Sequence, residues 1–259
     1  MVADYSCIEV ERSGRHVTIR MNLPRRRNAL SEVHLRELTE AFRAVATTDA
    51  AGIILAGAGP VFCSGHDYAD MVDRDVDATR ALLHLCREFM DTMRAVPQPV
   101  LARVHGLATA AGCQLVAAAD LAVAAESAGF ATPGGKGGSF CHTPLVEVGR
   151  VMGSKRALEM GLTGDVIDAA TAEQWGLINR VVPADQLDVA CLDLLDRATQ
   201  GSRSSKALGK QAFHHQVQLD RAQAYAYAIE VRAASSASPV TREHVASFLE
   251  KRMPSFDDA

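Results

Sequence analysis

Two segments of the chain share a pattern that limits the possible folds: an apolar, strand-like run followed by a tight turn of small residues. They are residues 57–67 (GAGPVFCSGHD) and residues 104–120 (VHGLATAAGCQLVAAAD), and the second continues as a helix. Backbone N–H groups at a strand end or in the first turn of a helix have no partner within the element. Two such segments side by side would direct two N–H groups at one carbonyl oxygen, as in an oxyanion hole.

The first half of the chain alternates strand and helix patterns. Apolar runs predict strands at 17–21, 52–56, 100–105 and 121–125. Helical spacing predicts helices over 31–46, 81–96 and 111–119, the first of them capped by Ser31. This alternation indicates an α/β core.

From about Ser154 onward, the chain is almost entirely helix-like. Helices are predicted over 154–161, 171–176, 183–199, 205–218, 221–234 and 241–251, with one strand at 179–182. We therefore expect a helical region packed on the core.

Charge and cysteine content restrict the class of protein. The formal net charge of -4 gives no overall attraction to nucleic acid or anionic membrane. The six cysteines are scattered without a CxxC pair, and the N-terminal segment has no apolar signal region. We expect reduced thiols, a cytoplasmic location, and no nucleic-acid or membrane partner.

Common nucleotide and metal motifs are incomplete. Gly57 and Gly59 lack the third glycine of a dinucleotide fingerprint, because Phe62 stands there. The glycines of residues 134–138 lack the Walker spacing, and there is no HExxH zinc motif. No metal site is expected.

Four motifs together resemble the enoyl-CoA hydratase/isomerase (crotonase) family in order and spacing. They are NLPRRRNAL (22–30), GAGPVFCSGHD (57–67), the run from HG to GCQL (105–115) and FATP (130–133), and residues 161–179 also match. The phrases HGLATAAGCQLVAA and FATPG are most similar to the branch of enoyl-CoA hydratase domain-containing protein 3.

The resemblance implies an α/β fold, a crotonase-like spiral of ββα units with a C-terminal helical region. Residues 1–195 would form the spiral core, and residues 196–259 a helical region for trimerisation and for covering coenzyme A (CoA). The implied partners are an acyl-CoA thioester and further copies of the chain in a homotrimer or hexamer. CoA would enter as part of the substrate, without a separate cofactor.

On the family pattern, the amides of His66 and Ala111 would bind the thioester oxygen and stabilise an enolate. For His66, the alternative that only its main chain matters is the stronger one, because many side chains fit such a position. Family hydratases carry two glutamates where this chain has Gln114 and Gly134. An amide has no useful pKa and glycine has no side chain, so efficient hydration is not expected.

Other side chains of this chain are candidates to replace the missing acid and base. Glu147 is a candidate from the following helix, although a solvated glutamate at a helix start is commoner. For Gln114, a structural role is about as plausible as a catalytic one. In the structural role its side-chain amide lies on the helix face and is hydrogen-bonded by neighbouring groups. If these positions are placed correctly, Gln114→Glu together with Gly134→Glu should raise the hydration of crotonyl-CoA.

Basic residues in the family motifs are expected to meet the CoA phosphates. Arg25 and Arg26 are the N-terminal candidates, and Lys251 would approach from an adjacent subunit. Adenine is expected against the backbone of Cys63, Ser64 and Gly65 and near Asp67. A solvated charge run is the alternative for each single arginine.

The reaction stays open at this stage. Isomerase, lyase, decarboxylase and slow hydratase chemistry are all compatible with an oxyanion hole. A catalytically silent acyl-CoA binding protein and a scaffolding oligomer with a vestigial pocket are the alternatives.

Overall fold

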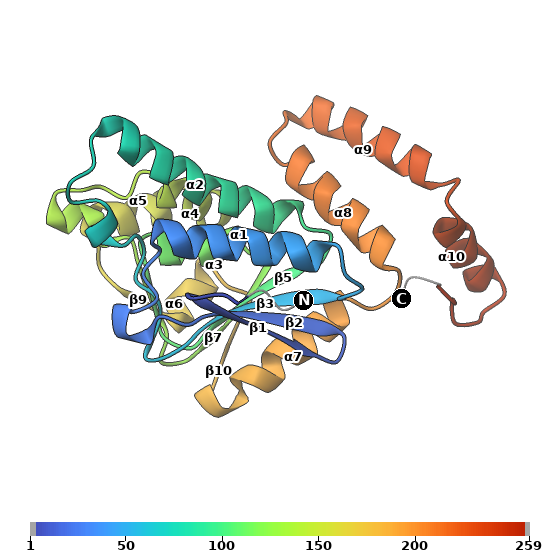
Figure 1. The fold of residues 1–259 in the computed structure, drawn as a ribbon. Coiled ribbons are helices and arrows are strands. Elements are labelled where there is room, and N and C mark those ends of the chain that lie inside the picture. Colours follow the sequence, from blue (N-terminus) through green and yellow to red (C-terminus); the bar gives the residue numbers. More distant parts are fainter. Residues whose placement is uncertain (1–3, 257–259) are drawn as a thin grey trace.

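The main β-sheet lies at the centre of the molecule, and within the described residues, 4–256, its strand order is β1-β2-β3-β5-β7-β10. Neighbouring strands are parallel except for β1 and β2, which form an antiparallel hairpin. A smaller sheet has the order β4-β6-β8-β9. In this computed structural model (Figure 1), residues 1–3 and 257–259, the outer ends of the two expected regions, lie outside the described part.

The strands are β1 (Ile8–Ser13), β2 (His16–Met21), β3 (Gly52–Gly57), β4 (Val61–Cys63), β5 (Val100–Val104), β6 (Leu107–Thr109), β7 (Leu121–Ala125), β8 (Gly129–Ala131), β9 (Ile167–Asp168) and β10 (Arg180–Val182). The helices are α1 (Glu32–Ala46), α2 (Val76–Ala95), α3 (Ala111–Ala118), α4 (Pro144–Met152), α5 (Ser154–Thr163), α6 (Ala169–Gln174), α7 (Leu187–Ala198), α8 (Arg203–Gln216), α9 (Arg221–Ser235) and α10 (Pro239–Leu249). Short 3₁₀ helices are η1 (Pro24–Arg26), η2 (Tyr68–Asp70), η3 (Pro133–Gly137) and η4 (Ala184–Gln186).

The chain repeats one path through the two sheets. A main-sheet strand, a short strand of the smaller sheet and a helix follow one another as β3-β4-α2, β5-β6-α3 and β7-β8-α4. This is the spiral of ββα units that the resemblance to the crotonase family implied. The repeat places the ends of β4 and β6 side by side, because these two strands pair in parallel.

Apolar side chains cover both faces of the main sheet. On one face α1 and α2 pack together, with the rings of Phe42 and Phe89 in an edge-to-face contact 5.2 Å apart. On the other face α7 contributes Leu187 and Leu195, which pack against Leu101 of β5. Figure 1 shows α1 and α2 above the sheet and α7 below it.

The long predicted elements are confirmed, and several short ones were missed. The strands predicted at 17–21, 52–56, 100–105 and 121–125 are β2, β3, β5 and β7. The missed strands include β4, β6, β8 and β9, which have two or three residues each. Runs this short carry no periodic signal, because their pairing depends on the neighbouring strand.

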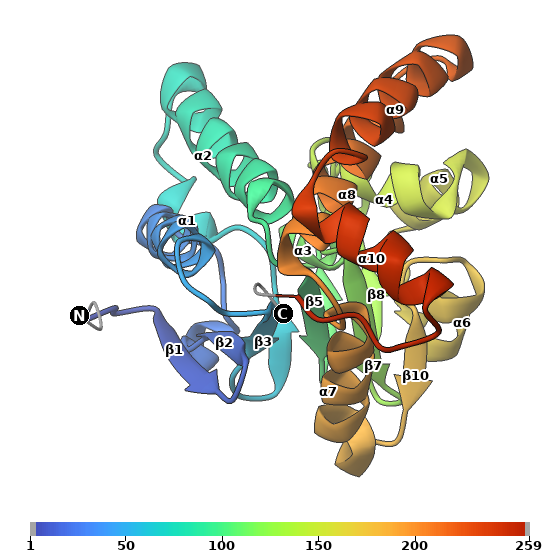
Figure 2. The same ribbon diagram turned by 90° about the vertical axis from the view of Figure 1, so that its right-hand side faces the viewer.

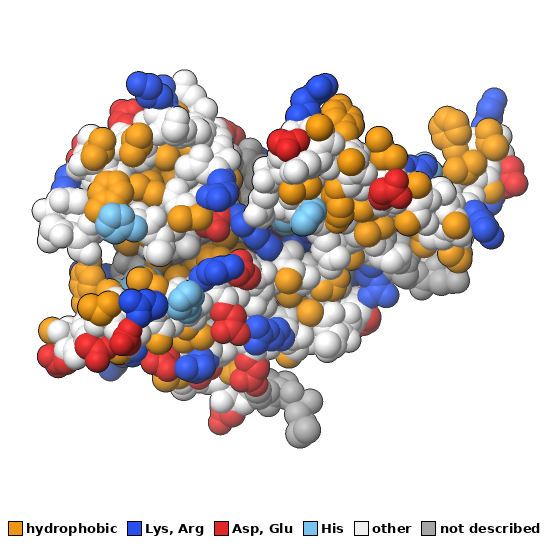
Figure 3. Space-filling view, turned by 90° about the horizontal axis from the view of Figure 1, so that it is seen from above, with side chains coloured by type: hydrophobic (Ala, Val, Ile, Leu, Met, Phe, Trp, Pro, Cys, Tyr) orange, Lys and Arg blue, Asp and Glu red, His pale blue; other side chains and the backbone are white. Residues whose placement is uncertain are grey.

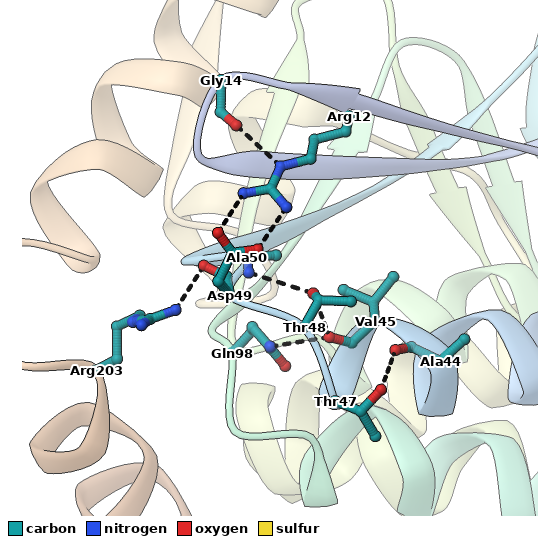
Figure 4. Close-up of polar contacts among 10 residues, drawn as sticks. All are labelled: Arg12, Gly14, Ala44, Val45, Thr47, Thr48, Asp49, Ala50, Gln98 and Arg203. Atoms are coloured by element: carbon teal, nitrogen blue, oxygen red, sulfur yellow. Dashed lines mark hydrogen bonds and ion pairs between the residues drawn. The ribbon is translucent and has the colours of Figure 1, made fainter. Parts of the chain in front are cut away.

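The C-terminal helices α8, α9 and α10 form an arm beside the core (Figures 1 and 2). One anchor is the buried Lys210 ammonium, whose Nζ lies 2.8 Å from Asp120 Oδ2 and 2.9 Å from the carbonyl oxygens of Met93 and Gln98. At the base of the arm, Arg203 donates to the Asp49 carbonyl oxygen at 2.6 Å (Figure 4).

Much of the arm leaves apolar side chains exposed. Every residue of α8 and α9 is at least partly exposed, although the Lys210 ammonium itself is covered. Figure 3 shows hydrophobic side chains gathered along the arm, beside the core. A groove of about 850 Å³ separates α8 from the ends of α2 and α3 and from α4. Among the described helices, none combines the length and apolarity that crossing a membrane requires.

Candidate active site

The first expected donor, the His66 amide, lies in the turn after β4. Gly65 turns the chain there with a φ of +91°. The Leu30 amide donates to the Gly65 carbonyl oxygen at 2.8 Å, and the Asp67 amide donates to the Leu30 carbonyl oxygen at 3.2 Å. Because a trans peptide directs its C=O and N–H oppositely, the His66 N–H points away from Leu30. Among residues 4–256 it has no hydrogen-bond acceptor.

The second expected donor, the Ala111 amide, is the first N–H of α3. Ala110 precedes it with φ 50° and ψ -118°, a conformation that strains a residue with a Cβ atom. The Ala110 amide is held by the Ala131 carbonyl oxygen at 2.9 Å. The first N–H groups of a helix have no partner within it, and in the described part of the chain nothing accepts from Ala111.

The structure brings these two turns together. A Cβ atom on Gly65 would lie 3.1 Å from the Ala111 nitrogen, so only glycine fits at this position without a shift. The Thr109 hydroxyl, just before the second turn, donates to the Ser64 carbonyl oxygen at 3.0 Å. Two N–H groups that have no acceptor among residues 4–256 therefore follow the ends of the adjacent strands β4 and β6. That both bind one carbonyl oxygen stays a prediction.

Gln114 lies one turn further along α3 and is buried. Its carboxamide oxygen has no hydrogen-bond partner in the described residues. Thr132 is fully buried as well, and its hydroxyl also lacks a partner there. A buried polar atom without a partner typically costs about 1–3 kcal/mol, so these atoms mark a place where a ligand or water would be stabilising.

Burial favours the neutral form of the His66 side chain. Burial lowers the pKa of its imidazole, and the neighbouring Leu30 carbonyl opposes the shift only in part. Both ring nitrogens are buried without a hydrogen-bond partner among the residues described. A neutral imidazole retains one donor and one acceptor nitrogen.

Gly134 occupies the second glutamate position, in η3, and has no room for a side chain. A Cβ atom there would lie 1.9 Å from the Ser139 carbonyl oxygen and 2.9 Å from Cys141 Sγ. The Ser139 amide closes the turn by donating to the Gly134 carbonyl oxygen at 2.9 Å. A glutamate at this position would force the turn to move, which weakens the expectation that Gly134→Glu supplies a working acid.

Glu147 is buried in α4 and paired with Arg94 of α2. Charge-assisted hydrogen bonds from a guanidinium direct a carboxylate at its partner. The structure thus gives Glu147 an ion-pairing position.

The basic residues of the first motif have different environments. Arg25 and Arg26 lie in η1, and both are exposed. The Arg26 guanidinium pairs with Asp67 at 2.5 Å. Asp67 also caps η2 by accepting from the Ala69 amide at 3.0 Å. Arg26 and Asp67 therefore lie together beside the first turn, and Arg25 is directed to solvent.

The other expected CoA contacts are separated within one chain. Cys63 is fully buried, and its thiol donates to the Asn28 carbonyl oxygen. Ser64 is partly exposed. Lys251 follows α10 in the arm, whereas Arg25 and Arg26 lie in η1.

Asn28 is a site residue that sequence reasoning missed, although it lies in the first motif. Its Oδ1 accepts from the Leu23 amide at 2.9 Å. Its Nδ2 lies 2.8 Å from the carbonyl oxygens of Ala58 and Val61 and 3.0 Å from that of Phe62. One buried amide thus fixes the segment that leads through β4 to the first donor. Thr109 and Thr132 also lie in the motifs at 105–115 and 130–133, and the sequence alone predicts no role for either.

Comparisons with known proteins agree with this architecture. The family model for enoyl-CoA hydratase/isomerase matches residues 11–259. The enoyl-CoA hydratase domain-containing protein 3, mitochondrial, of Mus musculus is 43% identical over 235 residues, which are 89% of this chain and 78% of that protein. Its name gives no support to the cytoplasmic location expected from the cysteines.

Solved structures are similar over nearly the whole chain. An enoyl-CoA hydratase from Mycobacterium smegmatis has a TM-score of 0.93 and 40% identity, covering 96% of this chain and 98% of that one. Human enoyl-CoA hydratase domain-containing protein 3 has a TM-score of 0.92 and 35% identity, covering 97% and 100%. The resemblance to the crotonase family and to this branch is confirmed, and the chain belongs to the enoyl-CoA hydratase/isomerase family.

Proposed function

We propose that this chain is an acyl-CoA enzyme that binds the thioester carbonyl with the amides of His66 and Ala111 and stabilises an enolate. The supporting observation is the juxtaposition of these two N–H groups, neither of which has a partner in the described chain. One such donor is worth about 2.7–4 kcal/mol when charge develops on the oxygen. Family membership favours acyl-CoA or fatty-acid metabolism as the setting.

The reaction is not an efficient standard hydration. Gln114 and Gly134 stand where family hydratases carry glutamates, and general acid–base groups contribute about 10²- to 10⁴-fold. Isomerase or lyase chemistry that depends mainly on enolate stabilisation remains within reach. The substrate brings CoA with it, and we propose no separate cofactor.

The second candidate is a catalytically silent acyl-CoA binding protein. One specific observation favours it: Glu147, the carboxylate considered as a replacement, is bound by Arg94. In both candidates Arg25 and Arg26 would meet the CoA phosphates, and the backbone of residues 63–65 would meet adenine near Asp67.

We also propose that the arm makes the chain a homotrimer or hexamer. Phe213, Tyr225 and Ile229 are each more than half exposed, which is costly for an apolar surface left in water. An adjacent copy would cover them, and its Lys251 would approach the CoA site. Analytical ultracentrifugation should give the mass of a trimer or hexamer, and a monomer would contradict this assignment.

The functional proposal is tested by removing one donor. Ala111 is the first residue of α3, so proline there removes the donor without breaking a helical hydrogen bond. The Ala111→Pro variant also carries Ala110→Gly, because a Cβ atom at residue 110 would crowd the proline ring in this backbone conformation. We expect Ala111→Pro to lower turnover of an acyl-CoA by roughly 10²- to 10³-fold. Its affinity for free CoA, which has no thioester carbonyl, should stay close to that of the wild type.

A panel of 2-enoyl-, 3-enoyl-, 3-hydroxyacyl- and malonyl-CoA thioesters identifies the reaction. Turnover of one of them, lost in Ala111→Pro, supports the enzyme. Calorimetric binding of these thioesters without turnover supports the silent binder. Failure of the wild type to bind either CoA or its thioesters contradicts both.

A further inference from the structure

The Thr109 hydroxyl links the two turns that carry the amides of His66 and Ala111. Thr109 is the last residue of β6, and its hydroxyl donates to the Ser64 carbonyl oxygen at 3.0 Å. Ser64 follows β4 and leads through Gly65 to His66. The bond therefore joins Thr109, just before the turn that carries the Ala111 amide, to Ser64, which begins the turn that carries the His66 amide.

Strand pairing does not reach this point. The ladder between β4 and β6 has an irregular register after Val61 and ends with the pair Cys63 and Ala108. Beyond that pair, the Thr109 bond is the one hydrogen bond that joins residues 64–66 to residues 109–111 in the described chain. Beyond the last strand pair, one side-chain hydrogen bond thus takes the place of the backbone hydrogen bonds of the ladder.

Each turn is otherwise held by a different neighbour. Leu30 binds Gly65 on one side, and Ala131 binds Ala110 on the other. These hydrogen bonds fix the direction of each N–H group. Close packing at Gly65 limits how near the two turns can approach, and the Thr109 bond limits how far apart they can move. Ala110 is strained, and a strained conformation persists only where the surroundings determine it.

We propose that Thr109 is a positioning residue that sets the separation between the His66 and Ala111 amides. This inference rests on the proposed function, because it assumes that both amides bind one carbonyl oxygen. Donors act on a developing oxyanion only within a narrow range of distance, and a displacement of about 1 Å can cost roughly 100-fold in rate.

The test compares Thr109→Val, which keeps the shape and removes the hydroxyl, with Thr109→Ser, which keeps the hydroxyl. Thr92→Val is a matched control, since the Thr92 hydroxyl donates to the Glu88 carbonyl oxygen at 2.8 Å within α2. Each variant is first checked for folding by circular dichroism. Should Thr109→Val not fold, Thr109→Ala provides the same comparison.

The readout is the infrared stretch of the thioester carbonyl in bound butyryl-CoA labelled with ¹³C at that carbon. This saturated probe needs no turnover, so the measurement serves an enzyme and a silent binder alike. We expect a shift to lower wavenumber in wild type, Thr109→Ser and Thr92→Val, and loss of most of that shift in Thr109→Val. Binding of free CoA should change little in any variant.

The two ideas fail differently. An unshifted carbonyl in the wild type, with butyryl-CoA bound, contradicts the proposed function itself. A wild-type shift that Thr109→Val keeps in full overturns the role of Thr109 and leaves the proposed function standing. Equal loss of the shift in Thr109→Val and Thr109→Ser also overturns it, because the serine keeps the hydroxyl.

Discussion

The Leu30 amide nitrogen lies 2.8 Å from the Gly65 carbonyl oxygen, and this bond sets the direction of the next amide in the chain. The peptide between Gly65 and His66 is planar, so fixing its C=O fixes the N–H of His66 on the opposite side. Leu30 is fully buried at the end of the first motif, directly before α1. The first donor is thus oriented by a buried residue distant in sequence.

Replacing Ala110 with glycine should not lower the stability of the fold. Its φ of 50° carries a strain of about 1–3 kcal/mol, and glycine at this position would not have that strain. The opposing effect is the greater conformational freedom of glycine in the unfolded chain, which costs about 0.5–1 kcal/mol of stability. We expect Ala110→Gly to leave the free energy of unfolding unchanged or to raise it by about 1 kcal/mol. Urea unfolding measures this.

The control for Ala110→Gly lies in the same helix. Ala117 is buried in α3, where glycine should lower the free energy of unfolding by about 1 kcal/mol. Equal destabilisation by Ala110→Gly and Ala117→Gly would show that Ala110 is not strained.

Any side chain at residue 134 should destabilise the fold. A Cβ atom there meets the Ser139 carbonyl oxygen at 1.9 Å, whereas a Cβ atom on Gly137 of the same turn meets nothing within 4 Å. We expect Gly134→Ala to lower the free energy of unfolding by about 1–3 kcal/mol and Gly137→Ala to change it little. Thermal unfolding of the two variants measures this difference. Equal melting temperatures for Gly134→Ala and Gly137→Ala would contradict the expected clash with the Ser139 carbonyl oxygen.

Restoring glutamates should therefore give less activity than the sequence alone suggested. Gln114→Glu keeps the size of the side chain, and we expect crotonyl-CoA hydration slightly above wild type. Adding Gly134→Glu should give no further gain, because the turn must move to admit it. A large gain in the double variant over Gln114→Glu, measured by loss of enoyl absorbance, would contradict this reading of the turn.

The ion pair between Arg94 and Glu147 should stabilise the fold. Both side chains are largely buried, and removing one partner leaves a charge without compensation. We expect Arg94→Met to lower the free energy of unfolding by about 3 kcal/mol. Arg43→Met breaks an exposed arginine–glutamate pair with Glu88, and should cost about 0–1 kcal/mol. Similar losses in both variants, by urea unfolding, would show that burial of the pair has no effect.

His34 should make the protein less stable in mild acid. Its ring is fully buried, and burial lowers the pKa of the imidazole below the unfolded value of 6.5. Below about pH 6.5 the unfolded chain then binds more protons than the native one, so the free energy of unfolding falls as pH falls. The slope from this group is at most about 1.4 kcal/mol per pH unit.

The comparison that isolates His34 uses urea unfolding at pH 7.5, 6.5 and 5.5. His34→Gln should flatten the decline below pH 6.5, whereas His142→Gln, at an exposed histidine, should leave it as in wild type. An unchanged slope in His34→Gln would rule out this residue as the source.

Sequence patterns predicted those features that depend on neighbours along the chain. The runs of β3 and β5, the amphipathic α1 and the small-residue turns before His66 and Ala111 are all local signals. The crowding of Gly134 by Ser139 depends on how one turn closes, and spacing does not reveal it. The pair of Arg94 with Glu147 joins two helices distant in sequence, so it required the tertiary structure.

The central claim is tested most directly by a crystal structure of the protein with butyryl-CoA bound. The account predicts the thioester oxygen about 2.7–3.1 Å from both the His66 and the Ala111 nitrogen. A well-ordered thioester whose carbonyl oxygen is bound by neither amide, or by only one of them, would contradict it.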